Sequence, residues 1–313
     1  MDTFEQAKIL PQAEDDFEVF QEMTPELAQK RRSQGRIIFD RFMRNRTAAM
    51  GAIFLILLIL FCFLGPLLTG HNNPNDVNVT QPMAAPSLQF PFGADDLGRD
   101  TLARAMAGGQ VSLLVGLSSM LVAILLGISI GAFAGYYGGI VDNILMRSTD
   151  TVLAIPAYLI LFVLSASFTD GSPVSVITLI AIFGWTVAAR LIRGEFLALK
   201  EREFVRAAEV VGARNFRLMF RHILPNAAGP IIVNATLLVG NNIILESVLS
   251  YFGFGIRVPL ASWGSMVNTG QGLFDVDPKL VLIPGALIFL TVLSCNLVGD
   301  GLRDALDPHM TER

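Results

Sequence analysis

Few residues in this chain stand where catalysis or metal binding would need them. The histidines His71, His222 and His309 are isolated, and the cysteines Cys62 and Cys295 lie inside apolar runs. Neither the His-Glu-x-x-His pattern of a zinc helix nor the Gly-x-x-x-x-Gly-Lys phosphate loop occurs in the sequence. We therefore expect no catalytic residue, no metal ligand and no bound cofactor in this chain, and no ATP hydrolysis by it.

Four polar side chains lie together in one apolar stretch, residues 227–250. They are Asn234, Asn241, Asn242 and Glu246, and the last two are four residues apart, so they share one helix face. An ionisable group inside a membrane span usually faces a cavity or a protein partner. The stretch is expected to line a translocation pathway. The alternative places Glu246 at the membrane interface or in a subunit contact, where it is hydrated.

Composition explains why membrane helices must position these residues. Hydrophobic residues make up 52% of the 313 and charged residues 16%, compared with about 25% charged in soluble domains. The apolar residues cluster in uncharged runs that reach the roughly 20 residues a membrane helix needs. The fold class is therefore an all-α membrane protein with six transmembrane helices. We expect these spans near 48–69, 109–135, 151–169, 174–192, 227–250 and 280–299.

The distribution of basic residues orients these spans. Of the 23 Lys and Arg residues, 19 lie in the leader 1–46, the segments 136–150 and 190–226, and the C-terminal tail. Because basic residues collect on the cytoplasmic side, both termini are expected in the cytoplasm of a cell whose plasma membrane holds the chain. Residues 27–46 indicate an amphipathic helix on that face or, alternatively, a plain basic stop before the first span. The net charge of −4 gives no sign of nucleic-acid binding.

Four glycines of the second span recur at every fourth position. Gly127, Gly131, Gly135 and Gly139 form a small-residue seam that lets another helix backbone approach closely. We expect this seam to serve helix packing.

The longest cytoplasmic loop, 193–226, carries a recognisable motif. Residues 206–212 read Arg-Ala-Ala-Glu-Val-Val-Gly, and Leu224-Pro225 follows twelve residues after the glycine. Residues 201–211 are expected to form a short helix, with Phe204, Val205, Ala208 and Val211 along one stripe. Gly212 permits a sharp exit from that helix.

This pattern resembles the EAA motif of ABC-importer permeases, although Arg206 stands where that family has Glu and His222 where Ile is usual. The resemblance implies that the loop is a coupling helix that docks on an ATPase subunit. The residues it assigns to coupling are Phe204, Val205, Ala207, Ala208, Glu209, Gly212, Leu224 and Pro225.

Three further segments, 92–100, 249–264 and 299–308, resemble signatures of dipeptide and oligopeptide permeases of the C type. The resemblance implies a type I ABC importer permease (MetI-like) fold over 47–313. It also implies a second homologous permease, two cytoplasmic ATPase subunits that hold ATP and magnesium, and an extracytoplasmic binding protein. The expected cargo is a peptide; the alternatives are nickel chelates, opines or another small solute. A membrane-embedded enzyme or an ion-driven carrier would need ionisable groups in several spans, and only the fifth has one.

Overall fold

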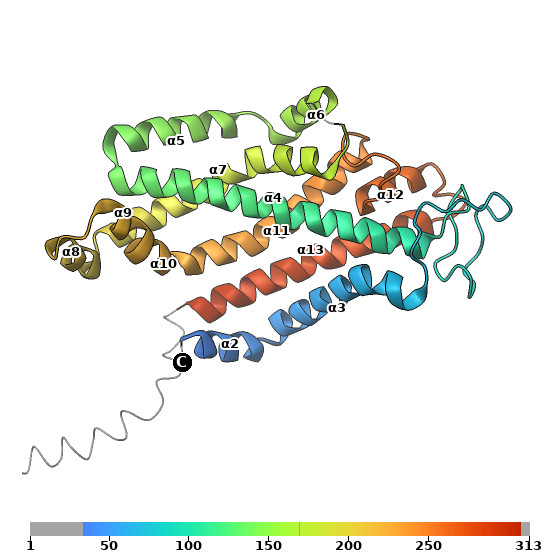
Figure 1. Ribbon diagram of the computed structural model, residues 1–313, viewed down its shortest axis with the longest axis horizontal. Coiled ribbons are helices and arrows are strands. Elements are labelled where there is room, and N and C mark those ends of the chain that lie inside the picture. The colour runs from blue at the N-terminus through green and yellow to red at the C-terminus, as the bar shows by residue number, and fades with distance from the viewer. Residues whose placement is uncertain (1–33, 169, 308–313) are drawn as a thin grey trace, which may run out of the picture. The chain divides into compact units, whose positions relative to one another are not determined.

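The computed structural model describes residues 34–168 and 170–307, and every regular element among them is a helix (Figure 1). The chain divides after Arg41, and the unit 42–313 contains the bundle described below. The helices are α2 (Gln34–Arg44), α3 (Arg46–Thr69), α4 (Thr101–Tyr137), α5 (Gly139–Ala154), α6 (Ala157–Phe168), α7 (Pro173–Lys200), α8 (Glu203–Val210), α9 (Asn215–Arg217), the π-helix η1 (Leu218–Ile223), α10 (Leu224–Asn226), α11 (Ala228–Tyr251), α12 (Trp263–Gln271) and α13 (Lys279–Leu306).

The amphipathic helix expected over 27–46 is present as α2 in its described part. Its apolar residues include Phe39 and Met43, which are 62% and 47% exposed. The remainder of that segment, and the rest of the leader, lie outside the described residues.

Five helices, α3, α4, α7, α11 and α13, are long and apolar enough to cross a membrane. They correspond to the first, second, fourth, fifth and sixth predicted spans. Most of their ends agree with the prediction to within a few residues, but α4 begins earlier, and α7 and α13 end later, than predicted. α4 has 37 residues, which makes it about 55 Å long. Since the hydrocarbon core is about 30 Å thick, the ends of α4 extend past it, as its glycine-rich termini indicate.

The third predicted span, 151–169, is wrong as a single helix. The structure has two helices there, α5 and α6, bent by 83° relative to each other. The break falls at Ile155 and Pro156. Ile155 is extended, with φ −85° and ψ 129°, because the residue before a proline avoids the helical region, and Pro156 has no N–H to donate. Most of the segment predicted as a loop, 136–150, is therefore the helix α5, and the bent pair makes a sixth span if it is counted as one.

Small residues allow the backbones of α4 and α7 to lie close together. A Cβ added to Gly127, Gly131 or Gly135 would lie between 2.5 and 2.6 Å from the nearest atom of α7. These three glycines therefore leave no room for a side chain. Gly139 does not belong to the seam, because it has φ +52° and no atom near its Cβ position. It is the first residue of α5, directly after Gly138, which separates α4 from α5.

Replacing Gly131 with Ala is expected to lower the free energy of unfolding by about 2 kcal/mol, because overpacking a filled contact costs about 1–3 kcal/mol. The new Cβ would lie 2.5 Å from the backbone oxygen of Ala189, which can move away only if the helix moves. Gly194→Ala is the matched control, since Gly194 of α7 has no atom near its Cβ position; this change should be neutral or stabilising. Denaturant unfolding in detergent measures both variants, and equal effects would contradict the seam.

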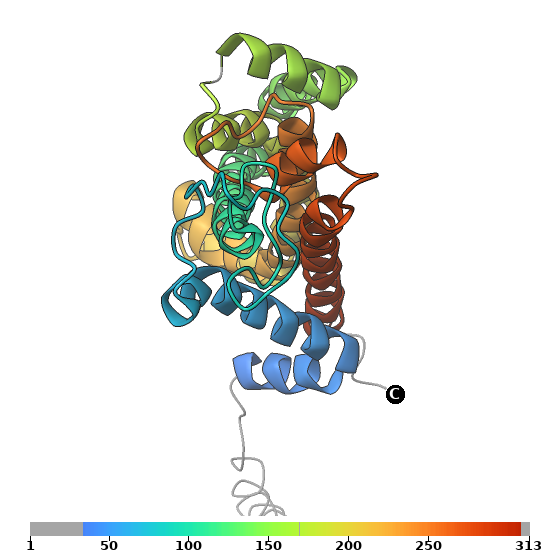
Figure 2. The same cartoon turned by 90° about the vertical axis from the view of Figure 1, so that its right-hand side faces the viewer.

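The remaining spans complete the bundle around α4. α13 packs against α3 and α11: a Cβ at Gly51 would lie 3.0 Å from Leu297, and one at Gly299 would lie 2.8 Å from Leu237. In both views, α3 lies along one edge of the bundle and the α5–α6 pair along the opposite edge (Figures 1 and 2). α8, α9 and α10 gather at one end, and α12 lies with the 70–100 loop at the other (Figure 1).

Candidate functional site

Helix α8 and the turn after it contain the motif of the longest loop. Gly212 has φ +89°, a value that favours glycine. The Ala213 N–H donates to the Ala208 carbonyl at 3.0 Å, and the Gly212 N–H donates to the Glu209 carbonyl at 2.8 Å. This pair of hydrogen bonds is the Schellman ending of a helix. The sharp exit expected at Gly212 is therefore present.

Buried side chains fasten α8 to the end of the bundle. Val205 is 2% exposed and belongs to one apolar cluster with Phe196 of α7 and three residues of η1. The Lys200 ammonium donates to the Tyr136 carbonyl at 2.7 Å, which joins the end of α7 to the end of α4. The same apolar cluster includes Ala132 and Tyr136 of α4, so α8 is packed together with the ends of both long helices.

Four apolar side chains of this segment are uncovered, and we call them the coupling patch. Phe204 is 41% exposed, Phe216 69%, Val210 87% and Val211 89%. An exposed apolar patch on a segment between spans is typical of a protein–protein contact. The segment can therefore receive a partner while its buried face holds it in place.

The predicted stripe of Phe204, Val205, Ala208 and Val211 is only partly correct. Val205 and Ala208 pack against the bundle, whereas Phe204 and Val211 do not face it. The reason is that α8 ends at Val210. Val211 is already the C-cap, and the turn at Gly212 directs it into solvent.

Arg206, which replaces the first Glu of the motif, is paired within the chain. Its Nη2 lies 2.6 Å from Oε2 of Glu201, and both side chains are about two-thirds exposed. The hydrogen bond from Arg206 lowers the pKa of Glu201. Exposed pairs of this kind contribute little stability, so we expect this one to orient the arginine rather than to hold the fold.

The other residues assigned to coupling divide by exposure. Ala207, Glu209 and Pro225 are exposed, and Leu224 is half-buried. Leu224 and Pro225 open the short helix α10, where a proline in the first turn loses no hydrogen bond. The part that these side chains play in coupling stays a prediction.

The polar span α11 turns two of its four predicted pathway residues inward. Asn242 and Glu246 are both 0% exposed. Glu246 accepts hydrogen bonds from the hydroxyls of Ser112 at 2.8 Å and Ser250 at 2.7 Å. The structure therefore does not support a lining role for Asn242 and Glu246, because this face of α11 packs against α4 inside the chain.

The two remaining polar residues of α11 are placed differently. Asn241 is exposed and Asn234 is half-buried, so a partner or a cargo could reach Asn241. Their pathway role stays a prediction. Neighbouring positions on a helix point about 100° apart, and the sequence alone could not tell which of them would meet α4.

The Ser-Trp-Gly segment fixes α12 to the same buried network. The Trp263 N–H donates to the Ser112 hydroxyl at 3.2 Å, and the Trp263 indole N–H donates to the Ala105 carbonyl at 2.9 Å. Trp263 is 0% exposed. Glu246 is therefore a positioning residue: through Ser112 it helps to hold the start of α12 on α4.

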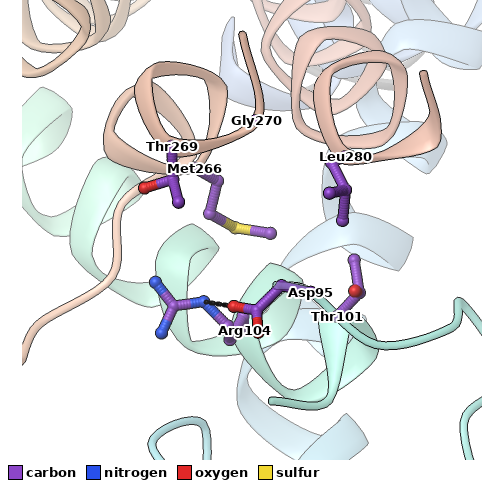
Figure 3. A pocket seen from close by; sticks show the side chains of 7 residues that line it. All are labelled: Asp95, Thr101, Arg104, Met266, Thr269, Gly270 and Leu280. Carbon is purple, nitrogen blue, oxygen red and sulfur yellow. Dashed lines mark ion pairs between the residues drawn. The ribbon is translucent and has the colours of Figure 1, made fainter. Parts of the chain in front are cut away.

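A buried ion network lies at the same end of the bundle. Asp95 Oδ2 is 2.7 Å from Arg99 Nε. It is also 3.7 Å from Arg104 Nε, the ion pair drawn in Figure 3. Asp95 Oδ1 accepts the N–H groups of Leu97 and Arg99. Thr101 and Arg104 border a cavity of about 20 Å³ beside this network, room for about one water molecule. Sequence reasoning missed the network, although an Asp and an Arg four residues apart are visible in the sequence.

Within the described residues, no group of three or more His, Cys, Asp or Glu side chains is arranged to hold a metal ion. Cys62 and Cys295 are buried free thiols in separate helices.

Comparison with known families decides what this helical bundle is. The profile of the binding-protein-dependent transport system inner membrane component matches residues 127–312, which is more than half of the chain. The chain belongs to this family. A second profile, the N-terminal transmembrane domain of oligopeptide transport permease C, matches residues 33–89. Together the two matches cover the segment from α2 to the 70–100 loop and the segment from the second half of α4 to the C-terminus.

Several curated proteins are similar to this inner membrane component over most of their length. The oligopeptide transport system permease protein OppC of Bacillus subtilis is 38% identical over 272 residues, 86% of this chain and 88% of the relative. A putative peptide permease protein of Brucella ovis is 42% identical over 272 residues, 86% and 89% of the two chains. The glutathione transport system permease protein GsiD of Pectobacterium atrosepticum is 36% identical over 279 residues, 89% and 92%.

These comparisons confirm the family resemblance seen in the motifs, and with the helices they confirm an all-α, multi-pass membrane protein of the MetI-like kind. The match over 127–312 spans every helix from α5 to α13 in this inner membrane component. The coupling patch and the polar span α11 both lie inside the matched region.

Proposed function

We propose that this inner membrane component forms half of the translocation pathway of an ATP-driven peptide importer. The observation that carries the proposal is identity of 36–42% to three proteins named as oligopeptide, peptide or glutathione permeases, over at least 86% of both chains. No observation favours nickel chelates or opines over peptides. We assign the second half of the pathway to a homologous permease, as the family resemblance of the motifs implies.

The energy source is assigned to other subunits. Two cytoplasmic ATPases bind ATP and magnesium, and this chain binds neither. The coupling patch and the Schellman turn at Gly212 support a rigid docking element on the cytoplasmic side. The basic residues near the ends of the spans support both termini in the cytoplasm. Closure of the ATPases then moves α8. This movement passes through the packed ends of α4 and α7 and shifts the spans between inward-open and outward-open states.

The opposite end of the bundle receives the cargo. The 70–100 loop and the segment 251–278, which contains α12, face the extracytoplasmic side in this orientation. The hydrogen bonds of Trp263 and the ion network of Asp95 support a preformed surface there. We assign the docking of the substrate-binding protein to it.

Purification and uptake test the proposal. Affinity purification of the tagged chain in mild detergent is expected to recover a second permease and two ATPase chains. The complex, reconstituted in liposomes with its binding protein, is expected to take up labelled oligopeptides when ATP is supplied on the ATPase side. Uptake of nickel chelates without peptides would overturn the cargo assignment, and recovery of the chain alone would overturn the coupling assignment.

A further inference from the structure

One tyrosine side chain, Tyr136, joins the last turn of α4 to the start of α9. Tyr136 is 9% exposed and belongs to the apolar cluster that also contains Val205 of α8 and Leu218 of η1. Its hydroxyl donates to the side-chain oxygen Oδ1 of Asn215, the first residue of α9, at 3.2 Å. Among the residues that the structure describes, this is the only hydrogen bond between a side chain of the segment 203–226 and a membrane-spanning helix.

Asn215 adjoins the coupling patch. In the sequence it stands between Val211 and Phe216, two of the four exposed apolar residues of that patch. Asn215 is itself exposed, and α9 gathers with α8 at one end of the bundle (Figure 1). The Tyr136 hydroxyl therefore connects α4 to the part of the chain that the proposed function places against an ATPase subunit.

The same tyrosine is also held by a third helix. The Lys200 ammonium, at the end of α7, donates to the Tyr136 carbonyl at 2.7 Å and lies 5.5 Å from the centre of the Tyr136 ring. That carbonyl is one of the last four of α4, which have no partner within their own helix. A cation over an aromatic face is attracted to the ring. Lys200 thus holds both the backbone and the ring of Tyr136, and α4, α7 and α9 meet at this residue.

The hydrogen bond adds a constraint that apolar packing does not supply. Contacts among apolar side chains are non-directional, so the cluster around Val205 would persist if α9 shifted slightly along α4. A hydrogen bond weakens steeply when its angle departs from the optimum. The pair of Tyr136 and Asn215 therefore fixes one position of α9 relative to α4.

We propose that Tyr136 is a positioning residue for coupling: its hydrogen bond to Asn215 fixes the coupling patch on α4, so that a displacement of the patch by the ATPases is carried into this span. The inference rests on the proposed function. It is distinct from docking, because Tyr136 is buried and is not a member of the patch. Without the hydroxyl, the ATPases still bind and hydrolyse ATP, but α9 shifts on α4 during part of their movement. ATP is then hydrolysed without transport.

The amount of peptide taken up per ATP hydrolysed tests this role, measured on the complete complex in liposomes with its binding protein. Tyr136→Phe keeps the ring and removes only the hydroxyl. We expect the ratio of peptide to ATP to fall about fivefold, the factor that one typical hydrogen bond contributes to an equilibrium. The affinity of the permease pair for its ATPases and the rate of ATP hydrolysis should stay at the wild-type values.

Variants of Asn215 identify the hydrogen bond as the cause. Asn215→Ala removes the acceptor and should lower the ratio as much as Tyr136→Phe does. The double variant should lower it no further, because both changes remove the same interaction. Asn215→Asp keeps an acceptor oxygen and should retain the wild-type ratio. Since Asn215 is exposed, these changes at its position should leave the fold intact.

Tyr137→Phe is the matched control. Tyr137 is the next residue of α4 and is 48% exposed, and its hydroxyl makes no hydrogen bond within the described part of the chain, so this variant should keep the wild-type ratio. An unchanged ratio in Tyr136→Phe, or an equal loss in Tyr137→Phe, would overturn the inference. So would weaker ATPase binding by Tyr136→Phe, because the contact would then serve docking. Uptake by the wild-type complex tests the proposed function and the variants test the inference, so the two can fail separately.

Discussion

The Val211→Asp variant is expected to lose its ATPase subunits, with the affinity for them reduced about a hundredfold. Val211 is the most exposed residue of the coupling patch, at 89%, and Gly212 holds the turn that presents it. When a partner covers the patch, an aspartate there would lose its hydration without gaining a cation. Leaving a charge buried and unpaired in this way costs several kcal/mol. Titration of the purified ATPase onto the permease pair measures the loss.

The fold should survive this change, because Val211 has little contact with the bundle. Val79→Asp is the matched control: Val79 is 79% exposed, but it lies in the 70–100 loop at the other end of the bundle (Figure 1). It should bind the ATPases as the wild type does. Wild-type affinity in Val211→Asp, with circular dichroism unchanged, would show that α8 and its turn are not the docking element.

Replacing Asp95 with Asn is expected to lower the free energy of unfolding by about 3 kcal/mol. Asp95 is 5% exposed, and the two arginines beside it, Arg99 and Arg104, are 8% and 4% exposed. Removing one partner of a buried ion pair costs about 3–5 kcal/mol, since the remaining charge stays buried without compensation. The amide oxygen of Asn can still accept the backbone N–H groups, so the lower end of that range applies. Denaturant unfolding in detergent measures the change.

Asp96→Asn serves as the comparison for the Asp95 variant. The Asp96 side chain is 41% exposed and its carboxylate lies 3.8 Å from Arg99 Nη2. Its loss should cost less than about 1 kcal/mol. If the two variants unfold at the same denaturant concentration, the 70–100 loop is held by something other than the buried charge of Asp95.

The sequence by itself predicted five of the six apolar segments as membrane helices and, through its motifs, the family. Uncharged runs of about 20 residues become helices in lipid because the backbone must satisfy its own hydrogen bonds there. This requirement is local, so α3, α4, α7, α11 and α13 could be predicted without knowledge of their neighbours. Gly212 was predictable for a similar reason, since a positive φ after a short helix is a property of a few consecutive residues.

Only the tertiary structure decided which way the polar residues face. Asn242 and Glu246 looked like pathway residues, but they meet Ser119 and Ser112 of α4. The charges of α5 and α7 looked like loop residues, yet Arg193 and Asp142, 51 positions apart in the chain, form an ion pair across a groove. Which face of a helix is buried depends on the partner helix and on the angle at breaks such as Pro156. The choice of partner helix and the size of the bend angle are set by long-range packing, which the local pattern of residues does not encode.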